Sequence, residues 1–257
     1  MDYITWMKVN GARERTIIQR ENFRLSRLRH WGHLDQSVDH IREWLGQFEG
    51  WTKCTYYGHL VSLYDWAVEV GEVATNPVRA IARPNTPKPG PRPLSRDEIA
   101  LSMNAASGDL LTHLQLGLLA GLRAHEIAKF RGEDITAQGI YVIGKGGQGA
   151  MLPTHPHLWE TAQSYPRRGF WFPSTRAPSG HIVSGTVTRR VTAHFRALEI
   201  TGSSHRNRHG YGTLLLRGGA NLRVVQELMR HASLHTTALY LGVDEDEKVA
   251  AIRSLVA

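Results

Sequence analysis

Hydrophobic and aromatic side chains recur at helical spacing along the first third of the chain. Between residues 52 and 70 they stand at positions 57, 60, 61, 64, 67 and 68, which is the spacing of one buried helix face. A shorter helix is expected near 38–47, and Asn76-Pro77 marks the end of the helical pattern. Residues 1–83 are therefore predicted to form an all-helical domain.

A further helix is predicted over residues 13–31, and it carries two rows of side chains. Ile18, Leu25 and Leu28 are expected to face inward. Four arginines at helical spacing form a separate row, and these are Arg13, Arg20, Arg24 and Arg27. Arginines on one helix face suit a phosphate backbone, although a solvated surface is the alternative.

A proline-rich segment separates this helical part from the rest of the chain. Five of the eleven residues over 83–93 are proline, which excludes a helix and favours an extended spacer. Ser95-Arg96-Asp97-Glu98 follows as a capping box that begins a new helix. The sequence thus predicts a linker over 84–93 and a second domain over 94–257.

The second domain has a mixed but mostly helical pattern. Residues 139–143 predict a strand, 144–149 a glycine-rich turn and 150–153 a returning strand. Helical patterns cover 96–107, 110–121, 124–131, 157–164, 185–199, 205–217, 221–230, 234–241 and 246–255. The expected fold class is mainly α, with one small β-hairpin.

Composition and charge narrow the class of partner. The chain of 257 residues carries 31 Lys and Arg against 23 Asp and Glu, which gives a net charge of +8. Residues 163–231 alone carry +9, which points to a polyanion, and Arg189, Arg190 and Arg206 are candidate DNA contacts there. The apolar run near 114–122 is too short to span a bilayer, no signal-peptide pattern is present, and Cys54 has no partner cysteine. These features predict a soluble intracellular protein without a membrane partner.

Four short stretches hold residues suited to chemistry on a phosphate. Arg123 ends the run Gly121-Leu122-Arg123, with Glu126 three residues later as a possible brace. Lys145 lies in the glycine-rich turn, which can approach a substrate closely. His205 and Arg208 share a helix face at i,i+3, and His231 precedes Tyr240 by nine residues. Each stretch alone is a weak signal.

In this order the stretches resemble the tyrosine recombinase (phage integrase) family. The resemblance covers essentially the whole chain, and it implies a SAM-like helical core-binding domain followed by a catalytic domain. The implied catalytic set is Arg123, Lys145, His205, Arg208, His231 and Tyr240. Only about 83 residues precede the linker, so we expect the small form of the family, which lacks an arm-binding domain.

The chain departs from the family pattern in three places. Arg230 stands before His231, where a glycine is common, and Asn207 stands before the second arginine, where an apolar or acidic residue is usual. The stretch Gly147-Gln148-Gly149 lacks the basic residue that often follows the hairpin lysine. None of the departures removes a member of the catalytic set.

The resemblance implies phosphoryl transfer without a metal ion or another cofactor. Tyr240 would attack a DNA phosphodiester to give a 3′-phosphotyrosyl link, while Arg123 and Arg208 stabilise the charge on the phosphate. Lys145 would protonate the 5′-oxygen, His205 would take the tyrosine proton, and His231 would donate a hydrogen bond to the phosphate. The i,i+4 histidine pairs 205/209 and 231/235 sit among arginines without an acidic or cysteine cluster, which argues against a metal site.

The expected function is a phage-type integrase acting on double-stranded core attachment sites in the cytoplasm of a bacterial host. The family implies a homotetramer on DNA formed from free monomers, possible control by a directionality factor, and a helix over 246–255 that docks on its own domain or on a neighbour. Alternatives are a resolvase, a transposon-type recombinase and a non-catalytic DNA-binding regulator. Type IB topoisomerases share the chemistry without requiring this assembly.

Overall fold

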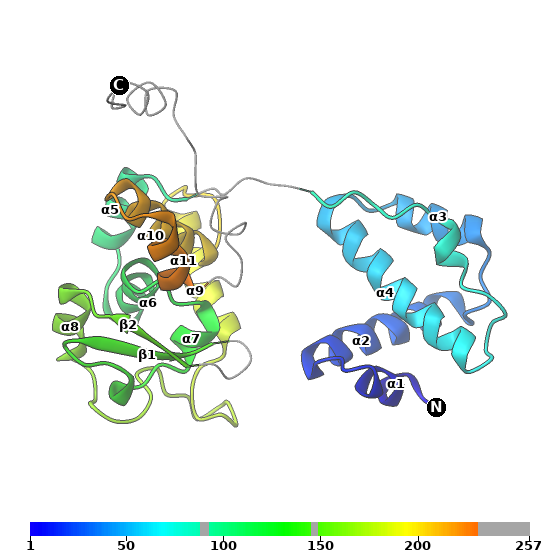
Figure 1. Cartoon of the computed structure of the whole chain (residues 1–257), viewed down its shortest axis with the longest axis horizontal. Coiled ribbons are helices and arrows are strands. Elements are labelled where there is room, and N and C mark those ends of the chain that lie inside the picture. Colours follow the sequence, from blue (N-terminus) through cyan, green and yellow to red (C-terminus); the bar gives the residue numbers. More distant parts are fainter. Residues whose placement is uncertain (88–92, 145–148, 231–257) are drawn as a thin grey trace, which may run out of the picture. The chain divides into compact units, whose positions relative to one another are not determined.

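The computed structural model of the chain describes residues 1–87, 93–144 and 149–230. It divides the chain into two units, Met1–Pro89 and Gly90–Ala257 (Figure 1), and each has its own core. None of the helices in the described ranges combines the length and the apolar character that a membrane crossing requires.

Within the described residues 1–87, the first unit contains helices and no strand. Its elements are α1 (Tyr3–Val9), α2 (Glu14–Trp31), α3 (Val38–Gly46), α4 (Gly50–Glu69) and a 3-10 turn, η1 (Pro77–Ala80). Asp2 caps α1 and Ser37 caps α3, because each side chain accepts a hydrogen bond from a backbone N–H in the first turn. The core joins buried residues of α1, α2 and α3 to the middle of α4.

Helix α2 presents a different face to the core from the one that its spacing predicts. Ile18 is 54% exposed and Leu25 is 47% exposed, whereas Ile17 and Phe23 are buried. The inward assignment of Ile18 and Leu25 is therefore wrong, and Leu28 is only partly buried against the core. The physical reason is that Trp44 of α3 and Tyr56 of α4 pack against Phe23, and the guanidinium of Arg27 stacks on the same Trp44 ring.

The second unit is mainly helical with one antiparallel hairpin, which confirms the expected fold class. The strands β1 (Gly139–Ile143) and β2 (Gly149–Pro153) pair with Gly139 opposite Pro153 and Ile143 opposite Gly149. The remaining elements are α5 (Arg96–Asn104), α6 (Gly108–Leu119), α7 (Ala124–Ala128), the 3-10 turn η2 (Gly132–Asp134), α8 (Pro156–Ala162), α9 (Ser184–Ala197), α10 (His205–Arg217) and α11 (Leu222–Met229). The predicted helices over 234–241 and 246–255 lie outside the described residues.

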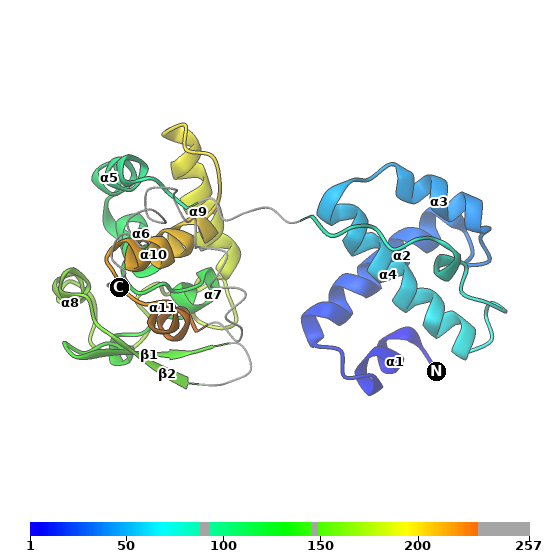
Figure 2. The ribbon, with the colours of Figure 1, turned by 45° about the horizontal axis from the view of Figure 1, so that its top comes forward.

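The core of the second unit places α6 and α7 between the hairpin and α9. Ile140, Val142 and Leu152 turn one face of the hairpin into the largest core cluster, together with residues of α6, α7, α8 and α9. Helix α10 packs on α6 and α11, and both views show the hairpin at the edge of this helical body (Figures 1 and 2). The predicted capping box of α5 is confirmed, because Ser95 and Glu98 exchange side-chain to backbone hydrogen bonds.

Candidate active site

Gly121 forms the turn that places Arg123 after helix α6. Its φ of +60° lies in the left-handed region, which favours glycine. A Cβ at this position would lie 2.5 Å from Cδ1 of Tyr211 in α10, well inside contact distance. Backbone conformation and close packing therefore both require glycine here, and the next two residues lead directly into α7.

Glu126 holds Arg123 at two points. Arg123 is the N-cap of α7, and its backbone N–H donates to Glu126 Oε2 at 2.7 Å. Its Nη1 also lies 3.2 Å from Glu126 Oε1. The Arg123 side chain is 30% exposed while that of Glu126 is 1% exposed, so the guanidinium is presented at the surface by a buried carboxylate.

Arg208 joins three elements from a buried position in α10. The residue is 2% exposed, and its guanidinium donates to the backbone carbonyls of Gly121 and Met229. These bonds tie α10 to the turn before α7 and to the last residue of α11. The neighbouring departure, Asn207, is buried against α6, and a Cβ on Gly117 would lie 3.0 Å from the Asn207 Cβ, so the close packing requires glycine at 117.

His205 begins α10, one turn before Arg208. Its ring lies 4.6 Å from that of His209, edge to face. Partial burial of the ring, followed by the positive charges of Arg208 and Arg123, lowers the pKa of His205 below its ordinary value. Burial, helped by His205 and Arg208, lowers the pKa of His209 to about 4. These surroundings favour the neutral form of both imidazoles in the free protein.

Arg230 is a member of this cluster that sequence reasoning did not assign a role. It caps α11 with a left-handed backbone, φ 53° and ψ 48°. Its Nη1 lies 3.1 Å from Glu126 Oε1 and its Nη2 lies 2.9 Å from Glu126 Oε2, while Nη2 also donates to the Gly121 carbonyl at 3.3 Å. Burial by itself would raise the pKa of Glu126, but the charges of Arg230 and Arg123 outweigh it and hold that pKa below its ordinary value. The sequence signal that pointed to this residue was the arginine at position 230, where the family pattern commonly has a glycine.

Three of the six candidate catalytic residues, Lys145, His231 and Tyr240, lie outside the described residues. The described part brings Arg123 and Arg208 together around Gly121 and Glu126, with His205 near both. Lys129, which follows α7, donates from Nζ to the Ile143 carbonyl at 3.2 Å. That bond connects α7 to the end of β1, just before the glycine-rich turn.

Three of the four arginines predicted to follow DNA on α2 have partners inside their own domain. Arg20 donates to Ser62 Oγ at 2.9 Å, and Arg24 pairs with Glu21 at 2.6 Å. The Arg27 Cζ lies 4.5 Å from the centre of the Trp44 ring, and burial lowers the pKa of Arg27. Arg20, Arg24 and Arg27 are half-buried and Arg13 is exposed, so the phosphate-facing row stays a prediction in which three members also have intramolecular partners.

The three candidate DNA contacts of the second unit also differ in whether their side chains have partners within the protein. Arg206 pairs with Glu98 at 3.0 Å and donates to the Pro93 carbonyl at 2.9 Å, so it ties α10 to the capping box of α5, and its contact with DNA stays a prediction. Arg190 lies 3.6 Å from Asp109. Arg189 is exposed on α9, with a 3.4 Å contact to Thr186 Oγ1.

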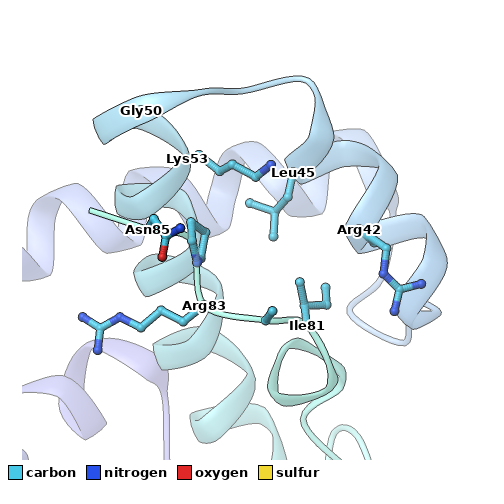
Figure 3. Close-up of a pocket in the computed structure, with 9 residues that line it drawn as sticks. Arg42, Leu45, Gly50, Lys53, Ile81, Arg83 and Asn85 are labelled. Carbon is cyan, nitrogen blue, oxygen red and sulfur yellow. The ribbon is translucent and has the colours of Figure 1, made fainter. Parts of the chain in front are cut away.

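A basic hollow in the first unit was not foreseen from the sequence. It has a volume of about 440 Å³ and lies between α3, the start of α4 and the chain that leaves the unit (Figure 3). Arg42, Lys53 and Arg83 line it and none of the described lining residues is acidic, although Arg42 also pairs with Asp39, one turn earlier in α3. Figure 3 shows the guanidiniums of Arg42 and Arg83 pointing outward on opposite sides. These three basic residues lie far apart in the sequence, so no local sequence pattern indicates that they form a cluster.

Comparison with known proteins supplies a family for this arrangement. The model of the phage integrase family matches residues 94–247. A tyrosine recombinase XerC from Rhodospirillum centenum is 32% identical over 204 residues, covering 72% of this chain and 60% of that relative, so the chain spans three fifths of its length. The integrase from mycobacterium phage Brujita is 32% identical with a TM-score of 0.54, covering 99% of this chain and 91% of that one. A lambda integrase (75–356) dimer bound to a COC′ core site matches in fold, at 19% identity and a TM-score of 0.73 over 91% of this chain and 94% of that one.

Proposed function

The chain belongs to the phage integrase family, and on this premise we propose that it is a site-specific DNA recombinase that cuts and rejoins strands through a phosphotyrosyl intermediate. One observation carries the proposal beyond the family match. Arg123 and Arg208, from different helices, are held around one turn by Glu126 and the Gly121 carbonyl. Two guanidiniums preorganised in this way suit the charge that develops on a phosphate during transfer.

Tyr240 is the proposed nucleophile. Its oxygen attacks phosphorus and forms a P–O bond while the bond from phosphorus to the 5′-oxygen breaks, so the bond energy is conserved for rejoining. The tyrosine proton passes to His205, whose lowered pKa keeps the imidazole ring neutral and able to accept it. Lys145 gives a proton to the leaving 5′-oxygen, and His231 donates a hydrogen bond to the phosphate.

The proposed substrate is duplex DNA carrying a core attachment site. The basic hollow of the first unit supports a phosphate contact there, and the exposed Arg189 supports one in the second unit. The lambda integrase match is to a dimer on DNA. We accordingly propose that free monomers assemble as a tetramer on two duplexes, where a directionality factor can act.

Two biological uses of the reaction follow from the relatives. Near full-length coverage of the Brujita integrase favours phage-type integration and excision. The XerC relatives favour the alternative, a chromosomal-type recombinase that acts on like sites. Recombination between two plasmids separates these uses: an integrase joins two different attachment sites, whereas a XerC-like enzyme recombines two copies of one site.

The chemical proposal is tested with a nicked duplex whose site has been selected from random duplexes by binding to the protein. Cleavage opposite the nick releases a short fragment and traps the covalent adduct, which is visible as a shifted protein band. The wild-type chain should form the adduct, and so should Tyr141→Phe, which changes an exposed tyrosine of β1. Tyr240→Phe should form none. An adduct in Tyr240→Phe would overturn the nucleophile, and its absence in the wild type would overturn the function.

A further inference from the structure

Arg230 combines an unfavourable backbone with a buried side chain. Helices often end in a left-handed residue that is usually glycine, since a side chain is strained in that conformation. Here the position is occupied by arginine at φ 53°, and its side chain is 11% exposed. A strained residue persists where its surroundings hold it, and an outlier of this kind points to a function for the side chain.

The side chain meets the acceptors that also hold the two candidate phosphate-binding arginines. Both of its terminal nitrogens face the Glu126 carboxylate, which also binds the backbone and guanidinium of Arg123. One of them shares the Gly121 carbonyl with Arg208. We propose that Arg230 is a positioning residue that sets Arg123 and Arg208 for the scissile phosphate by sharing Glu126 and the Gly121 carbonyl with them. This inference rests on the proposed function.

The physical reason for this role is the balance of charge around the buried Glu126 carboxylate. Without Arg230, Glu126 would be a buried carboxylate with Arg123 as its cation in the described cluster, and a buried charge holds its partner tightly. The carboxylate would then compete with the phosphate for Arg123. When Arg230 makes two hydrogen bonds to the Glu126 carboxylate, its positive charge balances most of the negative charge of Glu126. Arg123 is then braced in place while its positive charge stays available to DNA.

The test uses Arg230→Gly, because glycine fits the left-handed backbone and the variant should fold. At saturating protein, the single-turnover rate of adduct formation should fall by roughly 10- to 100-fold, the range typical of partners that orient ligating groups. The dissociation constant for the same duplex should change by less than about threefold, since the affected contact is used in the reacting geometry. Arg230→Lys should recover part of the rate, because one ammonium replaces part of the two-bond pair.

A matched control and a coupled variant complete the experiment. Arg223→Ala removes another arginine of α11, whose partner Glu227 is at the surface, and it should cleave at the wild-type rate. If Arg230 acts through Glu126, then Arg230→Gly should slow the Glu126→Gln variant much less than it slows the wild type.

Three results would overturn the inference once the wild type forms its adduct: a wild-type cleavage rate in Arg230→Gly, a loss confined to DNA affinity, or losses that multiply in the double variant. If the wild type forms no adduct, the proposed function fails on its own. The inference is then decided by the side-chain NMR signals of Arg123 and Arg208. Arg230→Gly must shift these signals and Arg223→Ala must not.

Discussion

Arginines in the two units are held in different ways. In the first unit, Arg20, Arg24 and Arg27 each have a separate neighbour, namely a hydroxyl, a carboxylate and an indole face. In the second unit, Arg123, Arg208 and Arg230 share two acceptors, the Glu126 carboxylate and the Gly121 carbonyl. Separate partners stabilise α2 itself or its packing on α3 and α4, whereas shared acceptors bring several positive charges to one place. That convergence, rather than the number of arginines, distinguishes the proposed phosphate site from a packed surface.

The largest effect is expected at Arg123. Arg123→Ala removes one of the two guanidiniums proposed to stabilise the phosphate, so adduct formation should slow by about 10² to 10³-fold, or roughly 3–4 kcal/mol. Because the side chain is 30% exposed, the thermal midpoint should move little. The measurement is single-turnover cleavage together with thermal unfolding. A variant that cleaves at the wild-type rate would remove Arg123 from the site.

A smaller effect is expected at Gly121. Gly121→Ala strains a left-handed backbone, by about 1–2 kcal/mol, and forces a Cβ into the Tyr211 ring. Gly71→Ala in the first unit is the matched control, because Gly71 has φ +79° and open space around it. Denaturant unfolding should show a greater loss of stability for Gly121→Ala, which should also cleave more slowly. Equal losses in the two variants would mean that contact with Tyr211 is unimportant.

Substitutions at Arg27 and Arg83 should have different effects in the first unit, one on stability and the other on DNA binding. Arg27→Met should lower the free energy of unfolding by about 1–2 kcal/mol, through loss of the stacking on Trp44, and leave DNA affinity unchanged. Arg83→Met should leave stability unchanged, weaken DNA binding and reduce the slope of log affinity against log salt by about 1. The measurements are DNA affinity across salt concentrations and chemical unfolding of both variants. If Arg27→Met weakens DNA binding and Arg83→Met does not, the arginine row of α2 is the DNA contact instead.

The smallest effect is a shift in the titration of His205. Since burial, Arg208 and Arg123 lower its pKa, the NMR titration midpoint in the free protein should lie below 6.5, and cleavage should persist on the acid side to below that pH. A group with a lowered pKa keeps its neutral form to lower pH, and neutral His205 is the proposed proton acceptor. Arg123→Ala removes one positive charge and should raise the midpoint, whereas Arg27→Met should not move it. A midpoint above 6.5 in the wild type would contradict this account.

Local patterns in the sequence predicted much of the fold. The capping box at Ser95 and Glu98 and the hairpin strands are found where the spacing placed them. The face of α2 was predicted wrongly, because the pattern treats arginine as a polar residue that points outward. In the structure, the guanidinium of Arg27 stacks on the Trp44 ring, and Ile18 lies on the exposed side.

Prediction of the site was limited by contacts between distant residues. The candidate residues Arg123, His205 and Arg208 came from motif order, and a brace by Glu126 from its spacing of three. Arg206 and Arg208 are two residues apart and were both candidates for DNA or phosphate. Their partners, Glu98 for one and the Gly121 carbonyl for the other, lie more than 80 positions away. Spacing along one helix cannot reveal such partners.

The sequence by itself determined the helical first unit, the proline-rich boundary, the hairpin and the order of residues that places the chain in its family. These depend on interactions between near neighbours, and they leave a periodic pattern. Only the tertiary structure decided which arginines have partners inside the protein, and that Arg230 shares Glu126 with Arg123. The reason is that burying a charge requires a compensating partner, and the fold alone decides which distant residue becomes that partner.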